Sequence, residues 1–69
     1  MQIIANGKPA EVKDGSSVTE MLTELKVQTP EYVSVELNGE IISRQIHDTT
    51  TISEGDVVEF LYFMGGGAS

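Results

Sequence analysis

The run Val57-Val58-Glu59-Phe60-Leu61-Tyr62-Phe63 is the most apolar stretch of this 69-residue sequence, and it decides the fold. It follows the turn residues Glu54-Gly55-Asp56, and only Glu59 interrupts its apolar character. A short apolar run bounded by turn residues is typical of a strand that is buried or nearly buried. We therefore expect this strand to lie between other strands of a sheet.

The two faces of this strand differ in polarity. Alternation along a strand places Glu59, Leu61 and Phe63 on one face, and the glutamate marks that face as the more solvent-exposed one. Leu61 and Phe63 are then predicted to form an exposed apolar patch, which Ile4 on the first strand extends. We expect this patch, together with Glu59, to bind a partner protein. The alternative is that Leu61 and Phe63 only pack a central strand that is covered on both faces.

Three glycines follow the strand, in the sequence Met64-Gly65-Gly66-Gly67-Ala68-Ser69. Glycine has no side chain to pack and loses the most backbone entropy on ordering, so residues 65–69 are predicted to form a flexible tail. Residues 1–64 then form one domain. A thin, flexible peptide is suited to enter the narrow active site of a partner enzyme. The alternative is a frayed chain end without function.

Two Asn-Gly pairs, Asn6-Gly7 and Asn38-Gly39, are strong signals for two-residue hairpin turns. Each pair lies between short segments that are rich in apolar residues or that alternate between apolar and polar residues. The expected strands are residues 2–5, 8–13, 32–37, 41–42 and 57–63. The polar segment 43–50 is expected to be irregular.

A single helix is predicted between the two hairpins. The sequence Ser17-Val18-Thr19-Glu20 has the pattern of a capping box, in which the serine and the glutamate satisfy free backbone N–H groups at a helix start. The apolar stripe that follows, at helical spacing, consists of Val18, Met21, Leu22 and Leu25. The helix is expected to end around residues 26–28, before Pro30.

The predicted order of elements is two strands, one helix, two strands and a last strand. This order indicates an α+β fold, with a mixed sheet of four to five strands and one main helix across one face. That architecture is the β-grasp, or ubiquitin-like, fold. The ferredoxin-like alternative needs a second helix, and the sequence has no second apolar helical stripe.

The composition limits the partners and sites that the chain can have. Eleven acidic and four basic residues give a formal net charge of −7. Because nucleic acids and anionic membranes need a cationic surface, we expect neither as a partner and instead expect a basic protein surface, although the charge can also serve solubility alone. Cysteine is absent and His47 is the only histidine, so no metal site is predicted. No apolar run approaches the roughly 20 residues of a membrane span, and the cytoplasm is the expected location.

The order and spacing of these motifs resemble those of the ThiS family, the small β-grasp sulfur carriers of thiamine biosynthesis. The matching segments span the whole sequence and are Met1-Gln2-Ile3, the Asn6-Gly7 turn, residues 14–18, residues 35–42 with Arg44, and residues 54–60 leading into the glycines.

The resemblance implies that the chain is a protein co-substrate and not an enzyme. A ubiquitin-activating-type (ThiF-like) enzyme is expected to adenylate the terminal carboxylate of the tail with ATP, while the chain itself binds no cofactor. A sulfur donor such as a cysteine desulfurase then leaves a thiocarboxylate, whose sulfur passes to a thiazole synthase (ThiG-like). The adenylating enzyme is expected to dock on the patch of Leu61, Phe63, Ile4 and Glu59, and the carrier is expected to be a monomer.

The sequence departs from the family pattern because Ala68-Ser69 follows the last glycine. A processing protease is therefore expected to remove these two residues and expose Gly67 as the sulfur acceptor. Gly66 is the second choice of acceptor, and Gly65 completes the glycine tail. The alternatives are a carrier like the small subunit of molybdopterin synthase, a carrier for amino-acid biosynthesis, and a ubiquitin-like interaction module without sulfur transfer.

Overall fold

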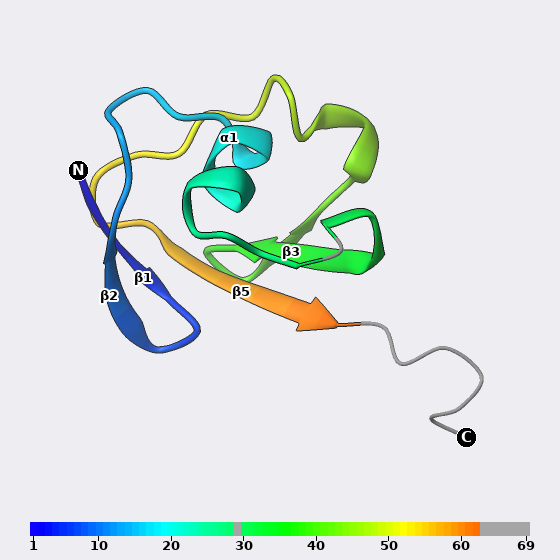
Figure 1. The fold of residues 1–69 in the computed structure, drawn as a ribbon, viewed down its shortest axis with the longest axis horizontal. Helices are drawn as coiled ribbons and strands as arrows, with labels where there is room; N and C mark the ends of the chain where they lie inside the picture. Colours follow the sequence, from blue (N-terminus) through cyan, green and yellow to red (C-terminus); the bar gives the residue numbers. More distant parts are fainter. Residues whose placement is uncertain (29, 63–69) are drawn as a thin grey trace.

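The last strand, β5 (Val57–Tyr62), lies in the middle of a five-stranded sheet in the computed structural model, which describes residues 1–28 and 30–62 (Figure 1). The other strands are β1 (Gln2–Ala5), β2 (Lys8–Glu11), β3 (Val33–Leu37) and β4 (Glu40–Ile42). Their order across the sheet is β2-β1-β5-β3-β4. β1 and β5 are parallel, and the other neighbours are antiparallel. This mixed sheet, with one helix on one side, confirms the predicted β-grasp fold.

β5 is held unequally by its two neighbours. It pairs with β3 over five positions, the last of which joins Val33 to Tyr62. It pairs with β1 at only two positions, the last of which joins Ala5 to Val58. The second half of β5 therefore has β3 on one side and extends beyond the end of β1 on the other.

Both predicted hairpin turns are confirmed. Asn6 and Gly7 join β1 to β2 with φ angles of 51° and 81°, and Asn38 and Gly39 join β3 to β4 with φ angles of 52° and 88°. Two successive positive φ angles define the type I′ turn, whose twist matches that of the flanking strands. Asparagine and glycine tolerate this left-handed conformation better than other residues.

The helix α1 (Val18–Glu24) begins at the predicted capping box. The Ser17 Oγ accepts a hydrogen bond from the Glu20 N–H at 3.1 Å, and the Glu20 carboxylate accepts one from the Ser17 N–H at 2.9 Å. The apolar stripe of α1 packs on the sheet, as Figure 1 shows for the helix above β3 and β5. The buried core consists of Ile3, Val12, Val18, Met21, Leu22, Val33, Val35, Ile52 and Val58.

The helix ends at Glu24, earlier than the predicted range of residues 26–28. Lys26 adopts a left-handed φ of 57°, and its N–H donates to the Thr23 carbonyl oxygen at 3.0 Å. The Val27 N–H donates to the Leu22 carbonyl oxygen at 3.0 Å, which completes a Schellman motif. The prediction was wrong because glycine usually occupies the left-handed position, and here a lysine does.

Four other details differ from the prediction, and one of them is that β4 begins at Glu40 and not at residue 41. The strand expected at 32–37 begins at Val33, because Tyr32 belongs to the short 3-10 helix η1 (Pro30–Tyr32). The segment 43–50, which was expected to be irregular, contains a second 3-10 helix, η2 (Arg44–Ile46). β2 ends at Glu11, whereas the prediction extended it to residue 13. That strand ends early because the backbone beyond it turns to the helix.

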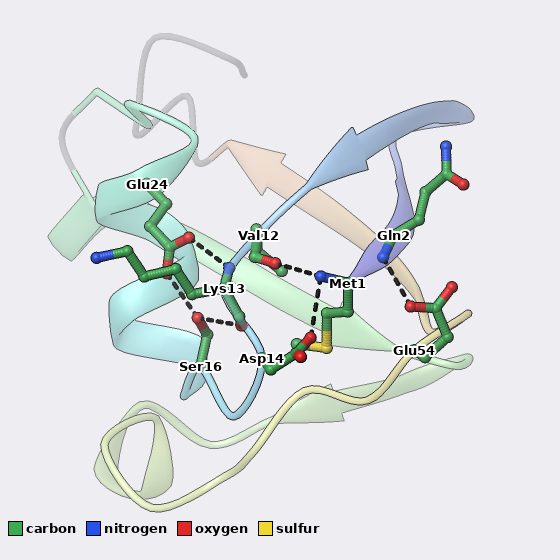
Figure 2. Close-up of polar contacts among 8 residues, drawn as sticks. All are labelled: Met1, Gln2, Val12, Lys13, Asp14, Ser16, Glu24 and Glu54. Carbon is green, nitrogen blue, oxygen red and sulfur yellow. Dashed lines mark hydrogen bonds and ion pairs between the residues drawn. The ribbon is translucent and has the colours of Figure 1, made fainter.

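Glu24 at the end of α1 binds the segment that joins β2 to the helix (Figure 2). One of its carboxylate oxygens accepts a hydrogen bond from the Lys13 N–H at 2.8 Å, and the other lies 2.6 Å from the buried Ser16 hydroxyl. The Ser16 hydroxyl also lies 2.8 Å from the Lys13 carbonyl oxygen. The hydrogen bond from Ser16, followed by that from Lys13, holds the pKa of the Glu24 carboxyl below its ordinary value.

We expect Glu24→Gln to lower the thermal midpoint of unfolding at neutral pH. The stabilisation by Glu24 is complete above the ordinary carboxyl pKa of the unfolded chain, because the carboxylate is charged in both states. It is lost as the pH falls through the lowered pKa of the folded state, so the difference between parent and variant should shrink in acid. Thermal unfolding followed by circular dichroism at several pH values measures this difference.

Glu40→Gln on the edge strand β4 is the control, since it removes an equal charge from an exposed position. If both variants respond to pH in the same way, the hydrogen bonds of Glu24 do not contribute to folding stability.

Candidate functional site

The face of the sheet opposite α1, which we call the open face, carries the residues expected to bind a partner. Val58 on β5 is fully buried on the helix side, whereas Leu61 is 43% exposed and Glu59 is exposed. The predicted division of β5 into a core face and a solvent-exposed face is therefore confirmed for these residues. The exposure of Leu61 speaks against the alternative of packing on both faces, and its part in binding a partner stays a prediction.

Apolar side chains gather on the open face at positions that the strand register defines. Ile4 is half-buried and pairs directly with Val57, which is 44% exposed. Residues that pair directly across strands point to the same face, so Ile4, Val57 and Leu61 share it. Ile41 on β4 is 58% exposed and belongs to the same face through its pairing with Glu36. Ile41 was not among the predicted site residues, because the face on which it lies depends on the pairing of β4 with β3 and of β3 with β5.

Two glutamates lie between these apolar positions. Glu36 on β3 pairs directly with Glu59 on β5, and both belong to the open face. Like charges that lie directly opposite each other on neighbouring strands destabilise a sheet. A cationic group of a partner would remove this repulsion, and the arrangement therefore favours a basic partner surface. Periodicity within β5 identified Glu59, but Glu36 could be found only from the register.

The remaining predicted site residues are Phe63, Gly65, Gly66 and Gly67, and they lie outside the described residues. Leu61 precedes Phe63 by two residues in the sequence, so the open face is covalently close to the glycine tail.

His47 takes part in the packing of the domain. It is buried, and its Nε2 lies 3.1 Å from the carbonyl oxygen of Ile42. Within residues 1–28 and 30–62, no group of three or more His, Cys, Asp or Glu side chains is placed to hold a metal ion. In the same part of the chain, no helix has the length and apolar character needed to cross a membrane.

The profile of the ThiS family matches residues 3–67. The chain belongs to the ThiS family. A crystal structure of the thiamine biosynthesis protein (ThiS) from Geobacter metallireducens has 55% sequence identity and a TM-score of 0.87, covering 97% of this chain and 100% of that chain. A solution structure of a thiamine biosynthesis protein from the same organism gives a TM-score of 0.77 at 55% identity, covering 97% of this chain and 88% of that one.

Two sequence relatives of this ThiS-family chain are named thiazole synthase. The protein from Magnetococcus marinus is 34% identical over 67 residues, and the protein from Paramagnetospirillum magneticum is 31% identical over 68 residues. These alignments include 97% and 99% of this chain. The chain spans about a fifth of the length of these relatives, 20% and 21% respectively. Each relative therefore contains a segment similar to a ThiS-family domain.

We expect Leu61→Asp to leave the domain folded and Val58→Asp to unfold it. Leu61 lies on the open face, so its carboxylate variant stays hydrated, and the free energy of unfolding should change by about 1 kcal/mol or less. Val58 is fully buried on the same strand, and an unpaired carboxylate there costs several kcal/mol, a large part of the stability of a small domain. Thermal unfolding followed by circular dichroism distinguishes the two. A lost transition in Leu61→Asp would mean that Leu61 belongs to the core.

Proposed function

We propose that this ThiS-family chain is a sulfur carrier protein, and not an enzyme, that supplies sulfur for the thiazole of thiamine. The observation that carries the proposal is the family match, which continues from the folded domain through the triple glycine to residue 67. The similarity at 55% identity to a thiamine biosynthesis protein supports the assignment to this pathway.

The chemistry takes place at the carboxyl end of the tail. Hydrolysis of the Gly67–Ala68 peptide bond by a processing protease exposes the carboxylate of Gly67, at the residue where the family match ends. A carboxylate is a poor electrophile, because its charge is delocalised and its leaving group is oxide. Adenylation with ATP by a ThiF-like enzyme releases pyrophosphate and gives an acyl-adenylate. The persulfide of a sulfur donor such as a cysteine desulfurase then displaces AMP and forms an acyl disulfide with the carrier. Two equivalents of a thiol reductant cleave its S–S bond, which leaves the thiocarboxylate on the carrier, the free thiol on the donor and the reductant as a disulfide.

The folded domain contributes binding. The open face presents Leu61 and Ile4, with Val57 and Ile41 beside them, to the adenylating enzyme. The carboxylates of Glu36 and Glu59 select a partner whose surface carries a cation between apolar contacts, and the net charge of −7 attracts such a surface from a distance. ATP is bound by the enzyme and not by the carrier.

A thiazole synthase is the proposed acceptor of the sulfur. Proteins with that name contain a segment that is 31–34% identical to almost the whole of this chain. A carrier-like segment within the same polypeptide as a thiazole synthase is expected if the two act on one another, because linkage raises their effective concentration. We propose that this chain serves an acceptor of the same kind, as a monomer in the cytoplasm.

Intact mass measurement on protein purified from its native host tests the proposed function. The carrier should lack Ala68-Ser69, and a fraction of the molecules should show one oxygen replaced by sulfur. Incubation with ATP, the adenylating enzyme, a sulfur donor and a thiol reductant should increase that fraction, whereas omission of ATP should not. If Ala68-Ser69 is present in every molecule and no sulfur is incorporated, the chain is an interaction module and not a sulfur carrier.

We expect Leu61→Asp to raise the KM of the carrier for its adenylating enzyme by about tenfold, the effect typical of a lost apolar contact at the centre of an interface. ATP–pyrophosphate exchange measures KM and kcat separately. The matched control is Ile46→Asp, because Ile46 is 46% exposed but lies on η2, outside the sheet. Glu59→Lys should raise KM as well, and by less at high salt. Equal effects of Leu61→Asp and Ile46→Asp would exclude the open face as the docking surface.

A further inference from the structure

The side chains of both turn asparagines, Asn6 and Asn38, hold β5. Asparagine is common in such turns because it accepts the left-handed conformation, and that role alone needs no contact by the side chain. Here each side chain accepts a hydrogen bond from a backbone N–H of β5. We infer that Asn6 is a positioning residue, which fixes the end of β5 from which the tail continues.

Asn6 extends the pairing between β1 and β5 beyond the end of β1. Its backbone N–H donates to the Val58 carbonyl oxygen at 3.0 Å, and its side-chain Oδ1 accepts from the Phe60 N–H at 2.9 Å. The main chain turns away at Gly7, so the next carbonyl oxygen that would serve Phe60 in a longer strand is missing. The amide oxygen of Asn6 takes its place. In Figure 1 the arrowhead of β5 extends past the β1–β2 hairpin.

Asn38 makes the same kind of contact at the other end of β5. Its backbone N–H donates to the Val57 carbonyl oxygen at 2.7 Å, and its Oδ1 accepts from the Val57 N–H at 2.9 Å. Its Nδ2 also donates to an Asp56 carboxylate oxygen at 3.1 Å. Asn38 therefore makes at least as many contacts as Asn6, but at the start of the strand, far from the tail.

The position of Asn6 gives its contact a consequence for the tail. Without the hydrogen bond from the Phe60 N–H to the Asn6 side chain, the last described contact of β5 on the β1 side is at Val58. Residues 59–62 are then held by β3 alone. The end of β5 then opens more often. If the partner enzyme binds only molecules with an ordered strand end, its apparent affinity falls in proportion to the ordered fraction. This inference rests on the proposed function, because it concerns delivery of the tail to the adenylating enzyme.

Three variants separate positioning from stability. Asn6→Gly keeps the turn, because glycine accepts a φ of 51°, and removes the side-chain acceptor. Asn6→Asp keeps both the acceptor and a residue that is common in type I′ turns. Asn38→Gly removes the corresponding acceptor at the start of β5 and has the same effect on the backbone entropy of the unfolded chain. Thermal unfolding checks that all three are folded.

In Asn6→Gly we expect the Phe60 amide to exchange with solvent on the order of two- to tenfold faster, which corresponds to the loss of one net hydrogen bond. With carriers that end at Gly67, the kcat/KM for ATP–pyrophosphate exchange with the adenylating enzyme should fall through KM, in proportion to the fraction of molecules whose strand end is ordered. In Asn6→Asp, which keeps the acceptor, the Phe60 exchange rate and kcat/KM should both stay close to those of the parent. Asn38→Gly should lower the thermal midpoint at least as much as Asn6→Gly, and should leave Phe60 exchange and kcat/KM close to those of the parent.

The outcomes are distinct. If the parent is adenylated and Asn6→Gly matches it in kcat/KM, or if Asn38→Gly loses as much activity as Asn6→Gly, then Asn6 has no positioning role. If the Phe60 amide exchanges as slowly in Asn6→Gly as in the parent, the inference is overturned, whatever the activity of the variant. If the parent, trimmed to end at Gly67, is not adenylated by any such enzyme, the proposed function fails, and the inference fails with it.

Discussion

The structure depends on the backbone hydrogen bonds that hold β5 between β1 and β3. The sequence continues from this strand into the triple glycine. Five paired positions with β3 and two with β1 hold the strand, and Asn6 and Asn38 supplement them with side-chain acceptors. The residues that make the hairpin turns thus also secure the strand that carries the tail.

The two faces of β5 have separate roles, and each role explains the residues found there. On the helix side, Val58 joins the core that makes the domain stable. On the other side, the apolar groups are spaced apart, and the pair Glu36–Glu59 lies between them. Like charges that lie directly opposite each other destabilise a sheet, and a cationic partner would recover that free energy on binding. The site is thus suited to recognition, and it needs no catalytic group of its own.

Local sequence patterns were sufficient for the five strands, for the start of α1 and for the division of β5 into a core face and an exposed face. The capping box at Ser17, the two Asn-Gly turns and the alternation through Leu61 are signals within a few residues, and the structure confirms each of them. Contacts between distant segments could not be read in this way. The pairing of Glu36 with Glu59 and the hydrogen bond from Phe60 to Asn6 depend on the register between strands, which no local pattern specifies.

A carrier that visits several enzymes needs a surface that binds each of them reversibly. Among the described residues of the open face, the apolar groups are separated by carboxylates, which would suit reversible binding. In the relatives named thiazole synthase, a similar segment shares one polypeptide with the rest of the protein, and linkage can replace much of the affinity for that one partner. Linkage would not help with the proposed adenylating enzyme or sulfur donor. For these two partners the affinity would have to come from a surface of the domain itself, and the open face is the surface that we propose for it.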